Sequence, residues 1–205
     1  MRLDQTAQLV YLVDDDLAVR EGVSELLASH DLRVISFASA AEYMAHVRED
    51  TAACLLLDLQ LPDINGLDLQ SRLRDESAVP IIFISGRGDI PSTVKAMKGG
   101  ALEFLTKPLD SVALIEAIRA AISRDIERRR EDQESTELKS RLARLTPRER
   151  EVLPLVVGGM LNKQAAATLG ISEVTLQLHR GHIMRKMAAK SFADLVRMAS
   201  RLAIS

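Results

Sequence analysis

Charged or polar side chains stand at the ends of four short apolar runs. Asp14 and Asp15 end the first run, Asp58 the second, Ser85 the third and Lys107 the fourth. An aspartate can act as a nucleophile toward a phosphoryl group, while a hydroxyl and an ammonium can hold the oxygens of that group. Carboxylates brought close together repel, and a hard divalent cation such as Mg²⁺ relieves the repulsion. If the four ends meet, these residue types predict a phosphoryl-accepting pocket that uses Mg²⁺.

The apolar runs have the length and composition of β-strands, and segments with helical spacing separate them. Five such βα units predict an α/β fold, a doubly wound parallel sheet covered by helices on both faces. The carboxyl ends of parallel strands meet at one edge, where ligands bind. Asp14, Asp15 and Asp58 are therefore expected to converge, because neighbouring strands lie about 5 Å apart. The expected strands are 8–13, 33–37, 53–59, 80–85 and 102–107.

Each segment between the strands carries a helical signal. Ser39 and Glu42 form a capping box, and Asp110 can cap the helix after the last strand. Val94 and Met97 are expected on the apolar face of the helix before that strand. Further apolar positions at helical spacing are Val19, Val23, Leu26, Leu27, Leu67, Leu69, Leu73, Leu114, Ile115, Ile118 and Ile122.

A strongly charged segment of mixed sign runs from Arg124 to Arg141 without glycine or proline. It could be a solvated helix with i,i+4 ion pairs or a disordered linker, and we favour the helix. Apolar residues at its two ends leave room for partial coiled-coil pairing, but its middle lacks apolar heptad positions, so that signal is weak.

The last part of the chain is basic, whereas the rest is acidic. Residues 1–140 carry 16 basic and 25 acidic side chains, a balance of −9, and residues 141–205 carry 11 and 4, a balance of +7. This asymmetry indicates two modules, of which the second is attracted to a polyanion. Thr146, Pro147 and Glu149 open a helix with a capping box. Four helices in a helix-turn-helix arrangement are expected over 147–159, 162–168, 173–187 and 191–202.

The composition excludes several classes of protein. With 205 residues, 47% of them hydrophobic and 27% charged, the chain has an ordinary composition and suits two small domains. No apolar run approaches the roughly 20 residues of a membrane span, and the N-terminus lacks the apolar stretch of a signal peptide. The single cysteine, Cys54, excludes an internal disulfide, so a cytoplasmic location without membrane contact is expected. No P-loop, Rossmann fingerprint or zinc-type Cys/His set is present.

Residues 8–123 resemble the receiver domain of bacterial two-component response regulators. The resemblance implies that Asp58 accepts a phosphoryl group from a phosphohistidine on a sensor histidine kinase. It also implies that the Lys107–Pro108 bond is cis, a form available to X-Pro at modest cost. The matching residues are Asp14-Asp15, Asp58, Leu61-Pro62-Asp63, Gly66, Ser85-Gly86, Gly99-Gly100-Ala101, Phe104 and Lys107-Pro108.

The same resemblance implies roles for the other pocket residues. Ser85 would hydrogen-bond the phosphoryl group, and Lys107 would pair with it. Phe104 would rotate inward as Ser85 moves, and the phosphorylated receiver would form a homodimer. The implied Mg²⁺ ligands are Asp15, Asp58 and the backbone carbonyl of Gln60, with Asp14 acting through water.

Residues 145–202 resemble the LuxR-type four-helix DNA-binding domain, and the two domains together resemble the NarL/FixJ architecture. The motifs are LTPREREVL from Leu145, Asn162-Lys163, LGIS from Leu169, Thr175, His179-Arg180 and IMRKM from Ile183. The resemblance places helix 173–187 in the major groove of duplex promoter DNA, with RNA polymerase as a candidate further partner. Gln177, Leu178 and Gly181 would face base edges, with Arg180 contributing to specificity. The residues expected at phosphates are Lys163, Thr175, Arg185, Lys186 and Lys190.

Several residues depart from the LuxR-type pattern. Gln177 stands where Lys is common, and Gly181 stands where a longer side chain is usual and weakens the helix. Ala188 occupies a usual glycine position at a helix end, where a positive φ is costly. Pro154 interrupts a helix, and Asn162 is expected to replace the cap that Leu161 cannot provide. Ala165 and Ala189 replace larger aliphatic residues, which would thin the core.

We therefore expect three parts: a receiver domain over 1–123, a helical linker over 124–144 and a DNA-binding domain over 145–205. The expected function is a phosphorylation-controlled transcription factor and not a metabolic enzyme. A haloacid-dehalogenase-like phosphatase would need a second acid two residues after Asp58, where the chain has Gln60. A phospho-regulated interaction protein whose helix-turn-helix domain no longer binds DNA specifically stays the alternative.

Overall fold

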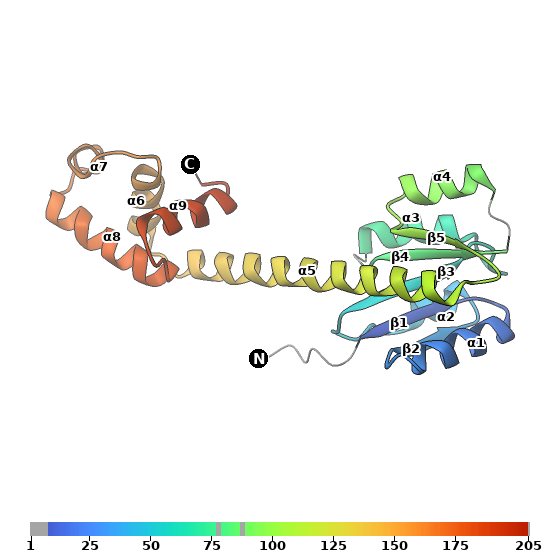
Figure 1. The fold of residues 1–205 in the computed structure, drawn as a ribbon. Helices are drawn as coiled ribbons and strands as arrows, with labels where there is room; N and C mark the ends of the chain where they lie inside the picture. Colours follow the sequence, from blue (N-terminus) through green and yellow to red (C-terminus); the bar gives the residue numbers. More distant parts are fainter. Residues whose placement is uncertain (1–7, 77–78, 87–88, 205) are drawn as a thin grey trace. The chain divides into compact units, whose positions relative to one another are not determined.

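The structure is a computed structural model that describes residues 8–76, 79–86 and 89–204. The chain divides into two compact units, residues 1–129 and 130–205. Figure 1 shows the α/β unit and the all-helical unit, with helix α5 (Ser111–Ala143) contributing to both. Each unit is described by itself.

The first unit is built on a five-stranded parallel sheet in the order β2-β1-β3-β4-β5. The predicted α/β fold is thus confirmed, and each strand lies within its predicted range. Strands β1 and β3 are apolar and fully buried, as expected for strands covered on both faces. The strands are β1 (Leu9–Val13), β2 (Arg33–Phe37), β3 (Ala53–Asp58), β4 (Ile81–Ser85) and β5 (Glu103–Thr106).

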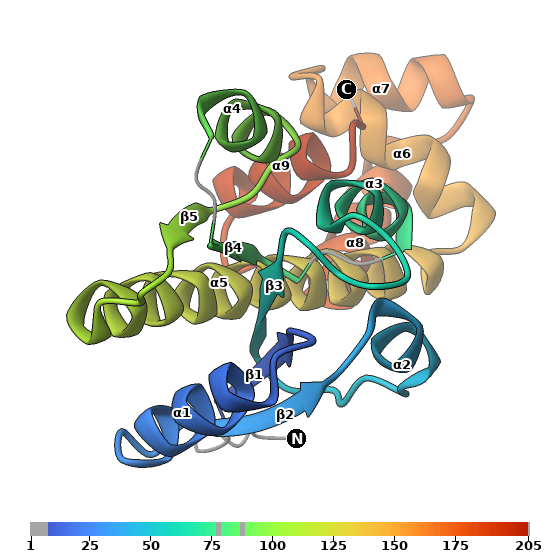
Figure 2. The ribbon, with the colours of Figure 1, turned by 90° about the vertical axis from the view of Figure 1, so that its right-hand side faces the viewer.

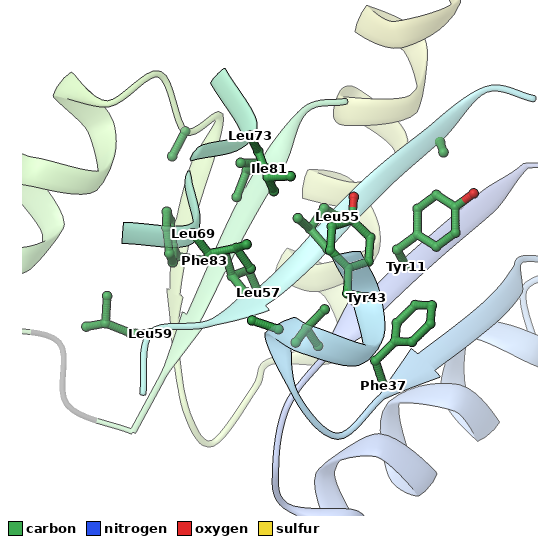
Figure 3. Packing of buried hydrophobic residues seen from close by; sticks show 14 of the residues in the cluster. Tyr11, Phe37, Tyr43, Leu55, Leu57, Leu59, Leu69, Leu73, Ile81 and Phe83 are labelled. Carbon is green, nitrogen blue, oxygen red and sulfur yellow. The ribbon is translucent and has the colours of Figure 1, made fainter. Parts of the chain in front are cut away.

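Helices cover both faces of this sheet, and each face has its own hydrophobic cluster. Helices α1 (Leu17–Ala28) and α5 pack on one face through residues such as Leu27 and Ile118. Helices α2 (Ala40–Ala45), α3 (Gly66–Glu76) and α4 (Ile90–Lys98) cover the other face (Figure 2). Figure 3 shows the second cluster, in which Tyr11, Phe37 and Tyr43 pack edge to face beside Leu55 and Leu57.

Helix α4 differs from its sequence pattern. Val94 and Met97, predicted on its apolar face, are 44% and 43% exposed, and Ile90 is 80% exposed. The small side chain of Ala96 is buried instead, and its carbonyl accepts a hydrogen bond from the buried amide of Gln70 at 3.0 Å. The helix therefore contacts the unit through a small residue and leaves an apolar stripe on the surface.

Helix α5 confirms that the charged segment is helical. Its first turns carry Leu114, Ile118 and Ile122 into the core of the first unit. Asp125 is fully buried, accepts a hydrogen bond from the backbone N–H of Ala53 at 3.1 Å and pairs with Arg129 at 2.8 Å. Asp125 therefore holds the first half of the charged segment against the start of β3.

The second unit consists of α6 (Pro147–Val157), α7 (Asn162–Leu169), α8 (Glu173–Met187) and α9 (Phe192–Arg201), together with the end of α5. Thr146 and Glu149 form the predicted capping box of α6, and Ser172 caps α8. Gly170 adopts the left-handed conformation that ends α7. α6 continues through Pro154 to Val157. The four predicted helices are thus confirmed with boundaries shifted by up to two residues.

Two expectations at helix ends had different outcomes. Ala188 has φ 55°, so the expected positive φ is present at a residue with a Cβ. Asn162, predicted to cap α7, does not do so, because its side-chain oxygen accepts a hydrogen bond from Arg180. The N–H of Leu161 is instead bonded to the Gln164 side chain at 3.2 Å.

Among the described residues, no helix has the length and apolar character that crossing a membrane requires.

Candidate functional site

The predicted acidic cluster forms at the carboxyl edge of the sheet. Asp14 follows β1, and Asp58 is the last residue of β3, its direct neighbour. The carboxylates of Asp14, Asp15 and Asp58 offer oxygen atoms that all lie within 4.8 Å of one another. Asp14 and Asp58 are buried, whereas Asp15 is exposed and opens the cluster to solvent. Three carboxylates at this separation form a donor set that fits a hard divalent cation.

Lys107, the residue after β5, bridges the two buried carboxylates. Its Nζ lies 2.6 Å from Asp14 Oδ2 and 2.6 Å from Asp58 Oδ2. Burial raises the pKa of Asp14, although the hydrogen bond from Lys107 opposes this shift. Burial alone would lower the pKa of Lys107, but its bonds to the two carboxylates raise it overall. The ammonium therefore stays charged and compensates the crowded negative charge.

Backbone and side-chain donors fix the loops around the pocket. The N–H of Asp16 donates to Asp14 Oδ1 at 3.0 Å, and the N–H of Gln60 donates to Asp58 Oδ1 at 3.0 Å. Arg20 on α1 donates to the carbonyl oxygen of Asp14 at 2.6 Å. Sequence reasoning missed Arg20, because no pattern in the sequence ties a helical arginine to a carbonyl six residues earlier.

Asp63 is a second residue whose contact sequence reasoning did not anticipate. Its carboxylate accepts a hydrogen bond from Ala41 N at 2.9 Å, at the start of α2. Burial works against the ionised form, but the backbone hydrogen bonds lower the pKa of Asp63 overall. The loop that carries Gln60 is closed by the Gln60–Asn65 bridge and is thus also tied to α2.

Ser85 and Phe104 lie on the neighbouring strands. Ser85 ends β4 and is buried, and its carbonyl accepts the N–H of Lys107 at 2.8 Å. Phe104 on β5 stacks on Phe83, with ring centroids 6.2 Å apart. The Lys107–Pro108 bond is cis, as the resemblance implied. The structure therefore gathers the strand-end residues Asp14, Asp58 and Lys107 and lays Ser85 and Phe104 on the strands beside them.

In the second unit, one face of α8 carries the residues predicted to face bases. Gln177, Leu178 and Gly181 are all exposed, and Leu178 is 58% exposed, so its side chain is not part of the core. A Cβ built on Gly181 would meet no atom within 4 Å, so this glycine serves no packing need. The hydroxyl of Thr175 is bonded to that of Ser172 at 2.8 Å, at the start of the helix.

The basic side chains of residues 141–205 fall into two groups. Seven make hydrogen bonds or ion pairs within the unit, and four make none within the described residues. Lys186 Nζ lies 2.7 Å from Glu149 Oε2, a buried carboxylate on α6. Arg180 donates to Asn162 and lies 4.8 Å above the ring of Phe192. The four that make none are Arg144, Lys163, Arg185 and Lys190, of which Lys190 interacts electrostatically with Asp194.

Comparisons with known proteins agree with this division. The sequence model of the response regulator receiver domain matches residues 10–119, and that of the luxR family of bacterial regulatory proteins matches residues 143–199. Nodulation protein W of Bradyrhizobium diazoefficiens is 46% identical over 201 residues, which cover 98% of this chain and 88% of the relative. Response regulator protein TodT of Pseudomonas putida is 44% identical over 201 residues, which again cover 98% of this chain and 88% of the relative. The solved structure of response regulator StyR matches with a TM-score of 0.86 and 41% sequence identity. The match covers 95% of this chain and 99% of the StyR chain.

Proposed function

This chain belongs to the NarL/FixJ family of response regulators, and on that premise we propose that Asp58 is its phosphoryl acceptor. The family makes the chain a two-component transcription regulator with a LuxR-type DNA-binding domain, not a metabolic enzyme. Its receiver domain implies a kinase partner, and its helix-turn-helix domain implies DNA. The observation that carries the proposal is the buried cluster of Asp14, Asp58 and Lys107.

At this cluster, a carboxylate oxygen of Asp58 would attack the phosphorus of a phosphohistidine on a sensor histidine kinase. The P–N bond breaks as the O–P bond forms, and the histidine takes up a proton as it leaves. Lys107 then transfers its bond from Asp58 to the phosphoryl oxygens, and Ser85 donates its hydroxyl to them. The residues that would hold Mg²⁺ are Asp15, Asp58 and the Gln60 carbonyl, with Asp14 acting through water. When bound, Mg²⁺ supplies positive charge that offsets the incoming phosphoryl group.

We expect the phosphorylated receiver to form a homodimer through α4 and β5. Ser85 and Phe104 connect the pocket to β5, since Phe104 stacks on Phe83. The exposed stripe of Ile90, Val94 and Met97 on α4 offers an apolar surface next to that strand. A phosphoryl group that Ser85 and Lys107 hold in one arrangement would shift the receiver toward the dimerising form.

For DNA, we propose that Gln177, Leu178 and Gly181 face base edges in the major groove. Lys163, Arg185 and Lys190 would contact phosphates, because they are exposed and their side chains make no hydrogen bond or ion pair among the described residues. Lys186 and Arg180 would support the helix rather than the contact, because they are engaged by Glu149 and Asn162. Promoter DNA, RNA polymerase and a cytoplasmic setting belong to the same proposal.

Phosphorylation of the purified chain tests the central claim. Incubation with acetyl phosphate and Mg²⁺ should add one acid-labile phosphoryl group, detected as a mass increase, and Asp58→Asn should abolish it. Asp68→Asn is the matched control, because Asp68 is an exposed aspartate on α3. Labelling of Asp58→Asn at the level of wild type would refute the assignment, and dimerisation measured by light scattering in parallel tests the α4–β5 surface.

A further inference from the structure

The last turns of α5 are part of the helical unit and not only a connection to it. Leu138 is buried in the hydrophobic cluster of this unit, and Leu142 packs against it. Glu134 on α5 accepts two hydrogen bonds from Arg201 at the end of α9, both 3.2 Å long. Yet the match to the luxR family begins only at residue 143. The segment predicted as a linker therefore supplies contacts that the DNA-binding domain lacks on its own.

One of these contacts reaches the end of helix α8. Arg141 Nη1 donates to the carbonyl oxygen of Met187 at 3.2 Å, and its Nε donates to Glu137 Oε1 at 2.9 Å. Met187 is the last residue of α8, where helix carbonyls lack partners within the helix and the helix dipole favours a cation. Glu137, one turn earlier on α5, orients the guanidinium toward that carbonyl.

The backbone conformation just after Met187 makes a stabilising contact at this helix end more important. Ala188 follows Met187 in the left-handed conformation, with φ 55°, which disfavours a residue with a Cβ. The N–H groups of Ala188 and Ala189 cap other carbonyls, those of Arg185 and Met184. Arg141 thus supplies the side-chain donor to the final carbonyl of a helix whose end is otherwise strained.

The same helix end carries two of the cations whose side chains make no hydrogen bond or ion pair among the described residues. Arg185 lies in the last turn of α8, and Lys190 lies just past it. The carbonyl of Arg185 accepts the N–H of Ala188 at 3.1 Å, and Lys190 follows the same turn. Arg141 contacts this turn through the Met187 carbonyl, and its own side chain points toward Glu137 and Met187.

We propose that Arg141 is a positioning residue for DNA binding, which acts by holding the end of the recognition helix α8 from the linker helix. This inference rests on the proposed DNA-binding role of Arg185 and Lys190. It gives the linker helix a direct part in DNA affinity: the helical turn with Glu137 and Arg141 must be formed for the phosphate contacts to be in place.

The test compares variants of the full-length chain. Arg141→Ala removes the contact, Arg141→Lys keeps a donor, and Lys139→Ala is the matched control. Lys139 lies on the same helix, is exposed and has no hydrogen-bond partner among the described residues, so its loss changes the net charge equally. The probes are a duplex enriched from a random-sequence pool by the wild-type protein and a scrambled duplex of the same composition. All measurements are made well below the melting temperature of each variant.

Arg141→Ala should weaken binding to the enriched duplex about three- to tenfold more than Lys139→Ala does, since a lost hydrogen bond of this kind has that equilibrium effect. Arg141→Lys should recover part of the affinity. Amide hydrogen exchange without DNA should accelerate at 188–190 in Arg141→Ala and stay at the wild-type rate in Lys139→Ala.

Equal affinities and equal exchange rates for Arg141→Ala and Lys139→Ala would overturn the inference. Faster exchange with unchanged DNA affinity would also overturn it, because the contact would then be structural only. Failure of the wild-type protein to enrich or bind any duplex would instead refute the proposed DNA-binding function, while the exchange rates would still report whether Arg141 holds the helix end.

Discussion

Charge is arranged in opposite ways in the two units. In the first unit, two buried candidate residues are paired, since Lys107 bridges Asp14 and Asp58 at 2.6 Å. In the second unit, the buried carboxylate of Glu149 pairs with Lys186 and joins α6 to α8. The cations proposed to contact phosphates there make no side-chain hydrogen bond or ion pair among the described residues.

The difference follows from what each site has to bind. A small phosphoryl group needs a pocket in which a few charges are held close together and shielded from water. A polyanion with widely spaced phosphates needs exposed cations that gain from releasing counterions. The pair of Lys107 with Asp14 and Asp58 therefore suits a binding pocket, whereas the pair of Lys186 with Glu149 suits a structural support.

The largest expected effect concerns the Glu149–Lys186 pair. Glu149→Ala removes the ion pair and the acceptor of the capping bond from Thr146 N, and should lower the free energy of unfolding by about 2–3 kcal/mol. Thermal or urea unfolding of the full chain measures it. A loss below about 0.5 kcal/mol, which is typical of surface pairs, would contradict the supporting role.

The same pair predicts an acid dependence. Burial opposes the ionised form of Glu149, but bonds from Lys186 and Thr146 outweigh it and lower its pKa below the ordinary 4.5. Its stabilising contribution is thus present above pH 4.5 and is lost as the pH falls through the lowered value. Glu149→Gln should flatten the pH dependence of unfolding in that range.

The next effect separates two neighbouring cations on α8. Arg185→Ala should reduce the slope of log affinity against log salt by about 0.9 and leave thermal stability unchanged, because Arg185 has no partner to lose among the residues that the structure describes. Lys186→Ala should instead destabilise the unit and leave the slope near its wild-type value. If Lys186→Ala reduced the salt-dependence slope and Arg185→Ala left it unchanged, an ion pair within the unit would not distinguish structural cations from those that contact DNA.

A smaller effect is expected at Asp14. Burial raises the pKa of Asp14 above the ordinary 3.8. The ionised carboxylate therefore lowers the stability of the fold at pH values above the raised pKa, and this loss is absent below pH 3.8. Asp14→Asn should therefore raise the free energy of unfolding at pH 7 and weaken Mg²⁺ binding. Unfolding experiments with and without Mg²⁺ measure both, with Asp68→Asn as control. A loss of stability without Mg²⁺ would show that the pocket is not strained by its own charge.

The smallest effect concerns Ala188. Ala188→Gly should raise the free energy of unfolding by about 0.5–1 kcal/mol, because glycine adopts φ 55° without the strain of a Cβ. Gly181→Ala offers a comparison, because a Cβ there meets no atom within 4 Å and should stabilise α8 by a similar amount. A destabilised Ala188→Gly variant would mean that the alanine methyl group makes a contact that outweighs the strain.

The sequence by itself determined the fold class and the identity of the acidic pocket. The period of apolar residues is local, and the carboxyl ends of parallel strands share one edge, so the convergence of Asp14, Asp15 and Asp58 was expected from the sequence and is present in the structure. Capping signals are equally local, which is why the box of Thr146 and Glu149 was predicted correctly.

Only the tertiary structure decided which charges are paired. The contacts of Arg20 with Asp14 O, Asp125 with Ala53 N, Lys186 with Glu149 and Arg141 with Met187 O join helices or strands that sequence spacing does not relate. It also decided that Ala96 is buried on α4 while Val94 and Met97 are exposed. Which partner a long charged side chain contacts depends on the distances and burial that result when the elements pack. Neither quantity can be read from the sequence.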